Sequence, residues 1–153
     1  MDVSEIYNFI RIDDSIATSG QPTEAQFRAA RDAGFKVVIN LAPDGLETSL
    51  PNEAELLGSL GMDYHHIPVP WAEPRLDHFE QFAAAMDESA GRGTLIDCQA
   101  NFRVTAFFAS YAIARLGWSE ERAGALIDRI WKSRPDFEMD GNWKGFIAAA
   151  RQG

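Results

Sequence analysis

The only cysteine of the chain, Cys98, is followed five positions later by Arg103. Cys98 ends the largely apolar run 94-TLIDC-98, and a helix-like run begins at Arg103. A turn from strand to helix directs several backbone amides at one point, and such amides at a helix N-terminus bind anions. The same field lowers the pKa of a cysteine, and an arginine can grip an oxyanion with two hydrogen bonds. These residue types predict a nucleophilic thiol beside a bound oxyanion.

A thiolate held beside a phosphate can attack phosphorus in line, and water can hydrolyse the cysteine–phosphate intermediate in a second step. This chemistry requires no cofactor. The loop lacks glycine, so Asn101 is its one residue that tolerates a left-handed conformation. We expect the loop and the first turn of the helix to bind the substrate through Gln99, Ala100, Asn101, Phe102 and Thr105.

Strand-like and helix-like segments alternate along the chain, without a repeat, linker or low-complexity segment. We expect strands at 8–12, 15–20, 36–40, 62–69 and 94–98. We expect helices at 23–34, 53–60, 75–90, 103–116, 119–134 and 142–151. The alternation predicts an α/β fold, a mostly parallel central sheet flanked by helices, in a single domain over residues 1–153. Ligands bind such sheets at the carboxyl ends of strands, which is where Cys98 lies.

Several helix boundaries can be predicted from capping patterns. Thr23 and Gln26 form a capping box, and Ser119 is the expected N-cap of the helix that follows it. Lys132 and Arg134 at the end of that helix match its dipole. The helix 103–116 is apolar around most of its circumference, which predicts that it is buried at the centre of the fold.

Composition argues against several classes of partner. The net charge is −9 and the estimated pI is 4.7, so the surface repels nucleic acid and anionic lipid. No apolar run is long enough to cross a bilayer, and the first residues lack the pattern of a signal peptide. A single cysteine excludes an internal disulfide and fits a reducing compartment. We therefore expect a cytoplasmic protein without nucleic-acid or membrane partners.

The three histidines do not predict a metal site. His65 and His66 are neighbours on an expected strand, so their side chains point to opposite faces of the sheet. His78 falls in the next helix. No other ligands occur at the usual spacings, so we expect no bound metal.

The segment 98-CQANFR-103 resembles the signature loop of the cysteine-dependent protein tyrosine and dual-specificity phosphatases. It is most similar to that of small bacterial phosphatase-like proteins with four residues between Cys and Arg. The segments 18-TSGQPT-23, 36-KVVINL-41, 67-IPVPW-71 and 130-IW-131, with a later Trp143, occur in the order found in that branch. The resemblance implies a phosphatase fold, Cys98 as the nucleophile and Arg103 as the phosphate-binding residue.

Two features depart from that pattern. Asp97 stands where these phosphatases usually carry histidine; it raises the pKa of the thiol if both side chains face the same way, whereas strand alternation points them apart. Pro70 occupies the place of the usual general acid. This leaves Glu73 as the first candidate for that role and Asp77 as the second. We expect Trp71, on the same loop, to pack against the core or to line the mouth of the pocket.

The leading hypothesis is a metal-independent phosphomonoester hydrolase that acts on a phosphorylated protein or a small-molecule phosphoester. Two alternatives stay open. A rhodanese-like sulfurtransferase also carries its cysteine on a short loop between a strand and a helix, and a loop of this length suits a terminal sulfur. An impaired pseudophosphatase would bind an anion or a partner without turnover, which fits the lack of a secure general acid.

Overall fold

The computed structural model describes residues 2–152. Within them, five strands form one sheet in the order β1-β2-β5-β3-β4, with β1 antiparallel to β2 and all other neighbours parallel. The strands are β1 (Ile10–Arg11), β2 (Ile16–Ser19), β3 (Phe35–Asn40), β4 (Asp63–His66) and β5 (Gly93–Asp97). The helices are the short 3₁₀ helix η1 (Val3–Glu5), α1 (Glu24–Asp32), α2 (Glu53–Ser59), α3 (Leu76–Glu88), α4 (Phe102–Arg115), α5 (Glu120–Trp131) and α6 (Gly141–Ala150). The predicted α/β fold is confirmed.

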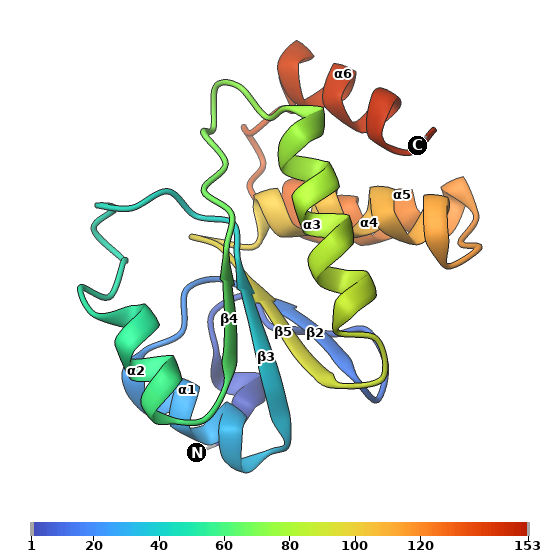
Figure 1. Ribbon diagram of the computed structural model, residues 1–153. Coiled ribbons are helices and arrows are strands. Elements are labelled where there is room, and N and C mark those ends of the chain that lie inside the picture. Colours follow the sequence, from blue (N-terminus) through green and yellow to red (C-terminus); the bar gives the residue numbers. More distant parts are fainter. Residues whose placement is uncertain (1, 153) are drawn as a thin grey trace.

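The sheet separates two layers of helices (Figure 1). Helices α1 and α2 cover one face, and α3 to α6 cover the other. Side chains alternate along β5 between these layers, as expected for a strand that is buried on both faces. Leu95 belongs to the core beneath α1 and α2, whereas Ile96 and Cys98 belong to the core beneath α3 to α6. The thiol therefore faces the larger helical layer.

The strand β4 is shorter than predicted, because two prolines follow it. The amides of Ile67 and Val69 still donate to the carbonyls of Asn40 and Leu41, at 2.9 and 3.0 Å. Pro68 has no amide hydrogen, so a regular ladder cannot continue through it. The chain beyond β4 thus runs beside the end of β3 as a loop and approaches the carboxyl edge of the sheet.

The predicted caps of two helices are confirmed. Thr23 and Gln26 form the reciprocal capping box of α1, and the Ser119 hydroxyl accepts a hydrogen bond from the Arg122 amide at the start of α5. Helix α5 ends at Trp131, earlier than predicted, so Arg134 lies in the segment that follows the helix rather than at its end.

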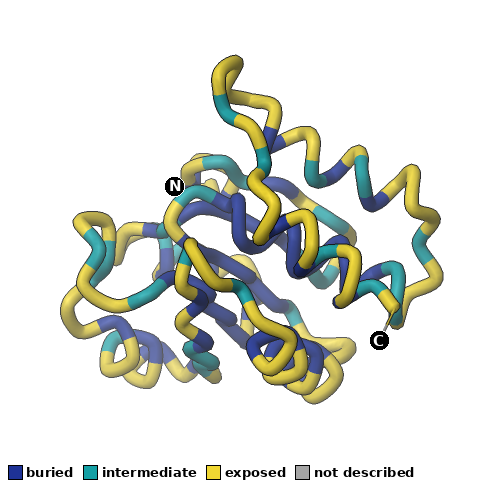
Figure 2. The backbone as a smooth tube through the Cα atoms, turned by 90° about the horizontal axis from the view of Figure 1, so that it is seen from above, coloured by how far each residue is buried: buried dark blue, intermediate teal, exposed yellow. Residues whose placement is uncertain are grey.

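Helix α4 is the central helix of the larger layer, as predicted. Every residue from 102 to 112 is buried. Figure 2 shows such buried segments enclosed by helices and loops that alternate between exposed and buried positions. Burial of this helix fixes the position of its first turn, which follows directly on the cysteine loop.

Candidate active site

The loop between β5 and α4 turns sharply at Asn101. Its φ angle is +73°, the left-handed conformation that Asn101 was expected to tolerate better than the other residues of the loop. The Asn101 amide group donates to the Asn8 carbonyl at 2.8 Å and to the Thr18 hydroxyl at 3.0 Å. The side chain that allows the turn therefore also anchors it to β2 and to the segment before β1.

The segment 18-TSGQPT-23 braces the same loop. The amide of Gln21 donates to the Gln99 carbonyl at 3.2 Å, and the Asn8 side chain donates to the Ala100 carbonyl at 3.0 Å. A Cβ atom at Gly20 would lie 2.9 Å from the Gln99 carbonyl oxygen, so only glycine permits this approach. The loop is held from outside by these contacts, and the amide of Ala100 acts on the Cys98 thiol.

Opposing effects act on the Cys98 thiol, which is fully buried. Burial raises its pKa, because a thiolate is poorly solvated there. The backbone amides of Val104 and Ala100 and the Arg103 guanidinium lower the pKa, and the net result lies above the ordinary value. The amides and the arginine that the sequence predicted do lower the pKa of the thiol, but burial outweighs them, so the pKa lies above its ordinary value and not below it as predicted.

Arg103 reaches across from the second residue of α4 to the loop after β4. Its Nε donates to the Val69 carbonyl at 2.9 Å, and its Cζ lies 5.3 Å from the centre of the Trp71 ring. Burial lowers the pKa of Arg103, and the neighbouring Cys98 opposes this effect. With Nε held in this way, the two terminal nitrogens are the groups available to an oxyanion.

A cavity of about 390 Å³ opens beside the loop. It lies within the range of about 300–1,000 Å³ typical of small-molecule sites. Its walls are Leu46, Trp71, Gln99, Ala100, Phe102, Arg103, Arg134 and Phe137. Trp71 lines the pocket and also packs against the core, where its ring stacks on Trp131 with the ring centres 5.4 Å apart, so both expected placements of Trp71 are found.

The structure brings only some of the predicted substrate-binding residues to this cavity. Gln99, Ala100 and Phe102 line it. Asn101 is fully buried and points to Asn8 and Thr18 instead. The hydroxyl of Thr105 donates within its own helix, to the Asn101 carbonyl at 2.9 Å and the Phe102 carbonyl at 3.2 Å. Asn101 and Thr105 therefore shape the loop and do not line the cavity.

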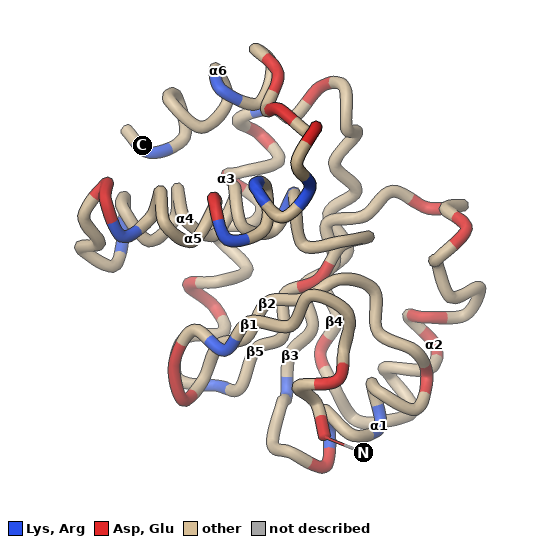
Figure 3. Tube along the Cα trace, turned by 180° about the vertical axis from the view of Figure 1, so that it is seen from behind, with Lys and Arg blue, Asp and Glu red and all other residues tan. Residues whose placement is uncertain are grey.

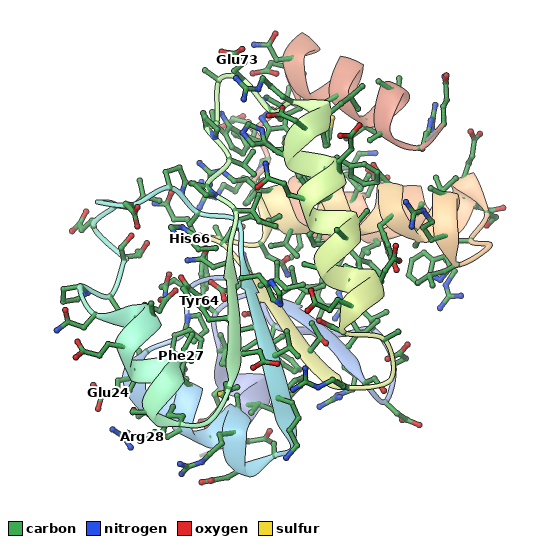
Figure 4. All side chains as sticks on the ribbon, viewed as in Figure 1. Glu24, Phe27, Arg28, Tyr64, His66 and Glu73 are labelled. Carbon is green, nitrogen blue, oxygen red and sulfur yellow. The ribbon has the colours of Figure 1, made fainter. Side chains whose placement is uncertain are left out.

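Neither predicted general acid lines the cavity. Glu73 is exposed near the tip of the loop between β4 and α3, where its side chain is directed outward (Figure 4). Asp77 is exposed at the start of α3 and accepts two hydrogen bonds of 2.9 Å from Arg75, which lower the pKa of the carboxyl group. An ionised carboxylate cannot donate a proton to a leaving group. The placement of Glu73 and Asp77 gives their predicted role no support.

Asp97 lies on the opposite face of β5 from Cys98, beside the polar cluster around Glu53. Glu53 accepts hydrogen bonds from Gln21 at 2.7 Å, from Asn40 at 2.9 Å and from Tyr64 at 2.7 Å. Figure 4 shows Tyr64 along β4, the strand that flanks β3. Neither carboxyl oxygen of Asp97 has a hydrogen-bond partner among residues 2–152. Burial, followed by the charge of Glu53, raises the pKa of Asp97 well above its ordinary value.

The buried Asp97 carboxyl group should make the free energy of unfolding depend on pH. Because the pKa of Asp97 is raised on folding, the folded chain holds this proton more tightly than the unfolded chain. The free energy of unfolding should therefore fall as the pH rises from the unfolded pKa, about 3.9, through the folded pKa. We expect Asp97→Asn to flatten this slope and to add about 1–3 kcal/mol at pH 8, since it removes a buried unpaired acid. Urea unfolding between pH 4 and 9 measures both quantities.

The control for this prediction is Asp14→Asn, which removes an exposed carboxylate instead of a buried one. It should leave the slope of stability against pH unchanged. An unaltered slope in Asp97→Asn would mean that this carboxyl group is solvated or paired in solution.

The part of the chain that the structure describes contains neither a membrane-spanning helix nor a cluster of metal ligands. Among residues 2–152, no helix has the length and apolar character of a membrane span. In the same residues, no three side chains of His, Cys, Asp or Glu are grouped so that they could hold a metal ion.

The strand order, the cysteine loop beneath α4 and the neighbouring arginine define a protein of the cysteine-phosphatase fold. The phosphatase-like domain of the beta-lactamase hydrolase-like proteins matches residues 8–115, and the chain belongs to this family. A DUF442 protein from Shewanella putrefaciens CN-32, classed as a phosphatase, has the same fold with a TM-score of 0.85 and 29% identity, over 98% of this chain and 95% of that one. The resemblance that the sequence predicted is confirmed.

Other relatives are more distant or much longer. Tk-PTP has a TM-score of 0.77 at 19% identity over 95% of this chain and 97% of that one, which shows a shared fold. The beta-lactamase hydrolase-like protein of Agrobacterium fabrum is 35% identical over 85 residues, which are 54% of this chain and 20% of that protein. The match to the Xylella fastidiosa protein covers 24% of its length. The chain thus spans about a quarter or less of the length of these curated relatives. That residues 1–153 form a single domain stays a prediction.

Proposed function

We propose that the chain is a phosphomonoester hydrolase in which Cys98 is the nucleophile and Arg103 binds the phosphoryl group. One observation carries this proposal. The Cys98 side chain lies beneath the start of α4, where the amides of Ala100 and Val104 and the guanidinium of Arg103 act on its sulfur. This combination of donors stabilises both a thiolate and a transferring phosphoryl group, without a metal ion.

The chemistry follows from these positions. The Cys98 thiolate attacks phosphorus in line, so that a P–S bond forms while the P–O bond to the leaving group breaks. The leaving oxygen takes a proton from solvent. Water then attacks phosphorus, loses a proton to solvent and breaks the P–S bond, which releases inorganic phosphate and restores the thiolate. Because Cys98 is fully buried and does not line the cavity, its attack on a substrate in the cavity requires a local movement of the loop.

The lack of a carboxyl group in the cavity wall predicts which phosphoesters react. Without a general acid, the leaving group departs as an anion, so its own acidity controls the rate. We expect kcat/KM for phenyl phosphate to exceed kcat/KM for a simple alkyl phosphate by at least about a hundredfold, the usual contribution of general-acid catalysis. A series of aryl and alkyl phosphates of graded leaving-group pKa tests this.

Two carboxamide variants serve as controls for the series. Glu73→Gln and Asp77→Asn should leave its slope unchanged, because neither residue lines the cavity. If Glu73→Gln slowed phenyl phosphate but spared 4-nitrophenyl phosphate, Glu73 would be the general acid that the sequence predicted. If no member of the series were hydrolysed, the proposed function would be wrong.

A sulfurtransferase is the second candidate, and the same cavity favours it. The Cys98 thiolate attacks the sulfane sulfur of thiosulfate, so that a persulfide S–S bond forms while the S–S bond to the sulfite group breaks. Sulfite leaves as an anion, so no general acid is needed in the cavity wall. Incubation with thiosulfate followed by mass spectrometry of the intact chain distinguishes the two functions. A gain of one sulfur atom that Cys98→Ser abolishes would identify a sulfurtransferase, whereas a phosphatase gives no such adduct.

A further inference from the structure

A second arginine lines the cavity beside Arg103. Arg134 follows α5, and its Cζ lies 5.2 Å from the centre of the Phe102 ring. Within residues 2–152, no carboxylate lies within ion-pair distance of Arg134. Arg134 is exposed like most arginines of the chain, but several of those pair with acidic neighbours, whereas Arg134 lines the cavity.

The two guanidinium groups rest on neighbouring rings. Arg103 lies over Trp71, Arg134 lies over Phe102, and the centres of these two rings are 6.4 Å apart with an edge-to-face geometry. Cation–π contact of this kind fixes where each positive charge sits. The chain therefore holds two like charges at one cavity.

No acidic residue offsets these charges in the cavity wall. The chain has 23 acidic and 14 basic residues, and Figure 3 shows the acidic ones spread over helices and loops on many parts of the chain. A cavity wall with two arginines and no carboxylate is the exception on such a surface. Two positive charges without a carboxylate in the wall attract an anionic ligand. If Arg103 holds the phosphoryl group, Arg134 is left to bind a second negative group of the same ligand.

We propose that Arg134 is a specificity-determining residue and that the substrate is a small aryl phosphomonoester with a second anionic group. This inference rests on the proposed function, in which Arg103 holds the phosphoryl group. Arg134 would then bind the second anion through its guanidinium. The aryl part fits the apolar side chains of Leu46, Phe102 and Phe137, which line the same cavity. An aryl leaving group also suits a cavity without a general acid.

Two isosteric substrates test the proposal. They are 4-(carboxymethyl)phenyl phosphate and 4-(carbamoylmethyl)phenyl phosphate, which differ in one charge but share a similar leaving group. For the wild-type chain we expect kcat/KM to favour the carboxylate by about fivefold to twentyfold, the effect of one charge-assisted hydrogen bond reduced for exposure. Arg134→Gln should remove this preference and leave kcat/KM for the neutral substrate within about twofold, and Arg134→Lys should keep part of the preference.

The matched control is Arg129→Gln, an equal loss of charge at an exposed position of α5 that does not line the cavity. It should keep the full preference. Equal preference in Arg134→Gln and wild type would overturn the proposal.

If the wild-type chain hydrolysed neither compound, titration of tryptophan fluorescence would give the two dissociation constants. Tighter binding of the carboxylate that depends on Arg134 would then support this inference while the proposed function fails, and equal binding of both compounds would overturn the inference.

Discussion

Replacing Cys98 by serine is expected to lower the kcat for aryl phosphate hydrolysis by at least about ten-thousandfold, as the loss of a nucleophile does in other enzymes. A serine hydroxyl in this position has a far higher pKa than a thiol, and no base lies among the residues that line the cavity. The substitution is nearly isosteric, so the loop should keep its shape. Steady-state kinetics with phenyl phosphate measure the loss.

Binding separates the chemical role of Cys98 from its structural role. Cys98→Ser should bind vanadate or phosphate within about threefold of the wild-type Kd, because Arg103 and the loop amides remain in place. Cys98→Ala, which leaves no nucleophile at all, should be equally inactive. Substantial activity in either variant would show that the thiol is not the nucleophile, and loss of both binding and folding would show that the buried sulfur is mainly a packing group.

Local patterns in the sequence predicted the parts of the site that are close together in the chain. The strand predicted at 94–98 is found at Gly93–Asp97, and the helix predicted from 103 is the buried helix α4. Asn101, expected to be the one loop residue that tolerates a left-handed conformation, adopts it; each of these features depends on a few neighbouring residues. The caps at Thr23 and Ser119 could be predicted for the same reason. The order of the segments then placed the thiol at the carboxyl edge of a parallel sheet.

The far walls of the cavity could not be predicted in this way. Leu46 comes from the loop after β3, and Arg134 and Phe137 come from the segment after α5. No periodicity links these residues to Cys98, since tertiary packing alone brings them together. Arg134 had a sufficient local explanation as a cation near a helix end. The observation that α5 ends at Trp131 was needed before another role could be considered.

The protonation state of the site also depends on packing. The sequence indicates the donors that lower the pKa of Cys98, but not that the side chain is fully buried, and burial reverses the net effect. In the same way, alternation pointed Asp97 away from the thiol, yet only the structure shows that its carboxyl group has no partner within residues 2–152. Both results require knowledge of what covers each group.

Replacing Arg103 is expected to give the second large loss of activity. Arg103→Lys should lower kcat/KM for aryl phosphates by about a hundredfold to a thousandfold, the usual cost of losing one donor to a developing oxyanion. A lysine keeps the positive charge but not the planar fork, so its single nitrogen cannot replace the Nε that donates to the Val69 carbonyl together with two parallel donors to the phosphoryl group. Kinetics with phenyl phosphate measure the loss, with Arg129→Lys as a control that should behave like the wild type.

The rate of Cys98 alkylation against pH separates the charge of Arg103 from its geometry. Arg103 lowers the pKa of the thiol against the effect of burial, so Arg103→Gln should raise that pKa further. Arg103→Lys should leave it close to the wild-type value, because a positive charge remains. Vanadate should protect the thiol from alkylation more strongly in the wild type than in either variant. If Arg103→Lys retained activity within about tenfold, a point charge would suffice at this position, and the bidentate role assigned to the guanidinium would be wrong.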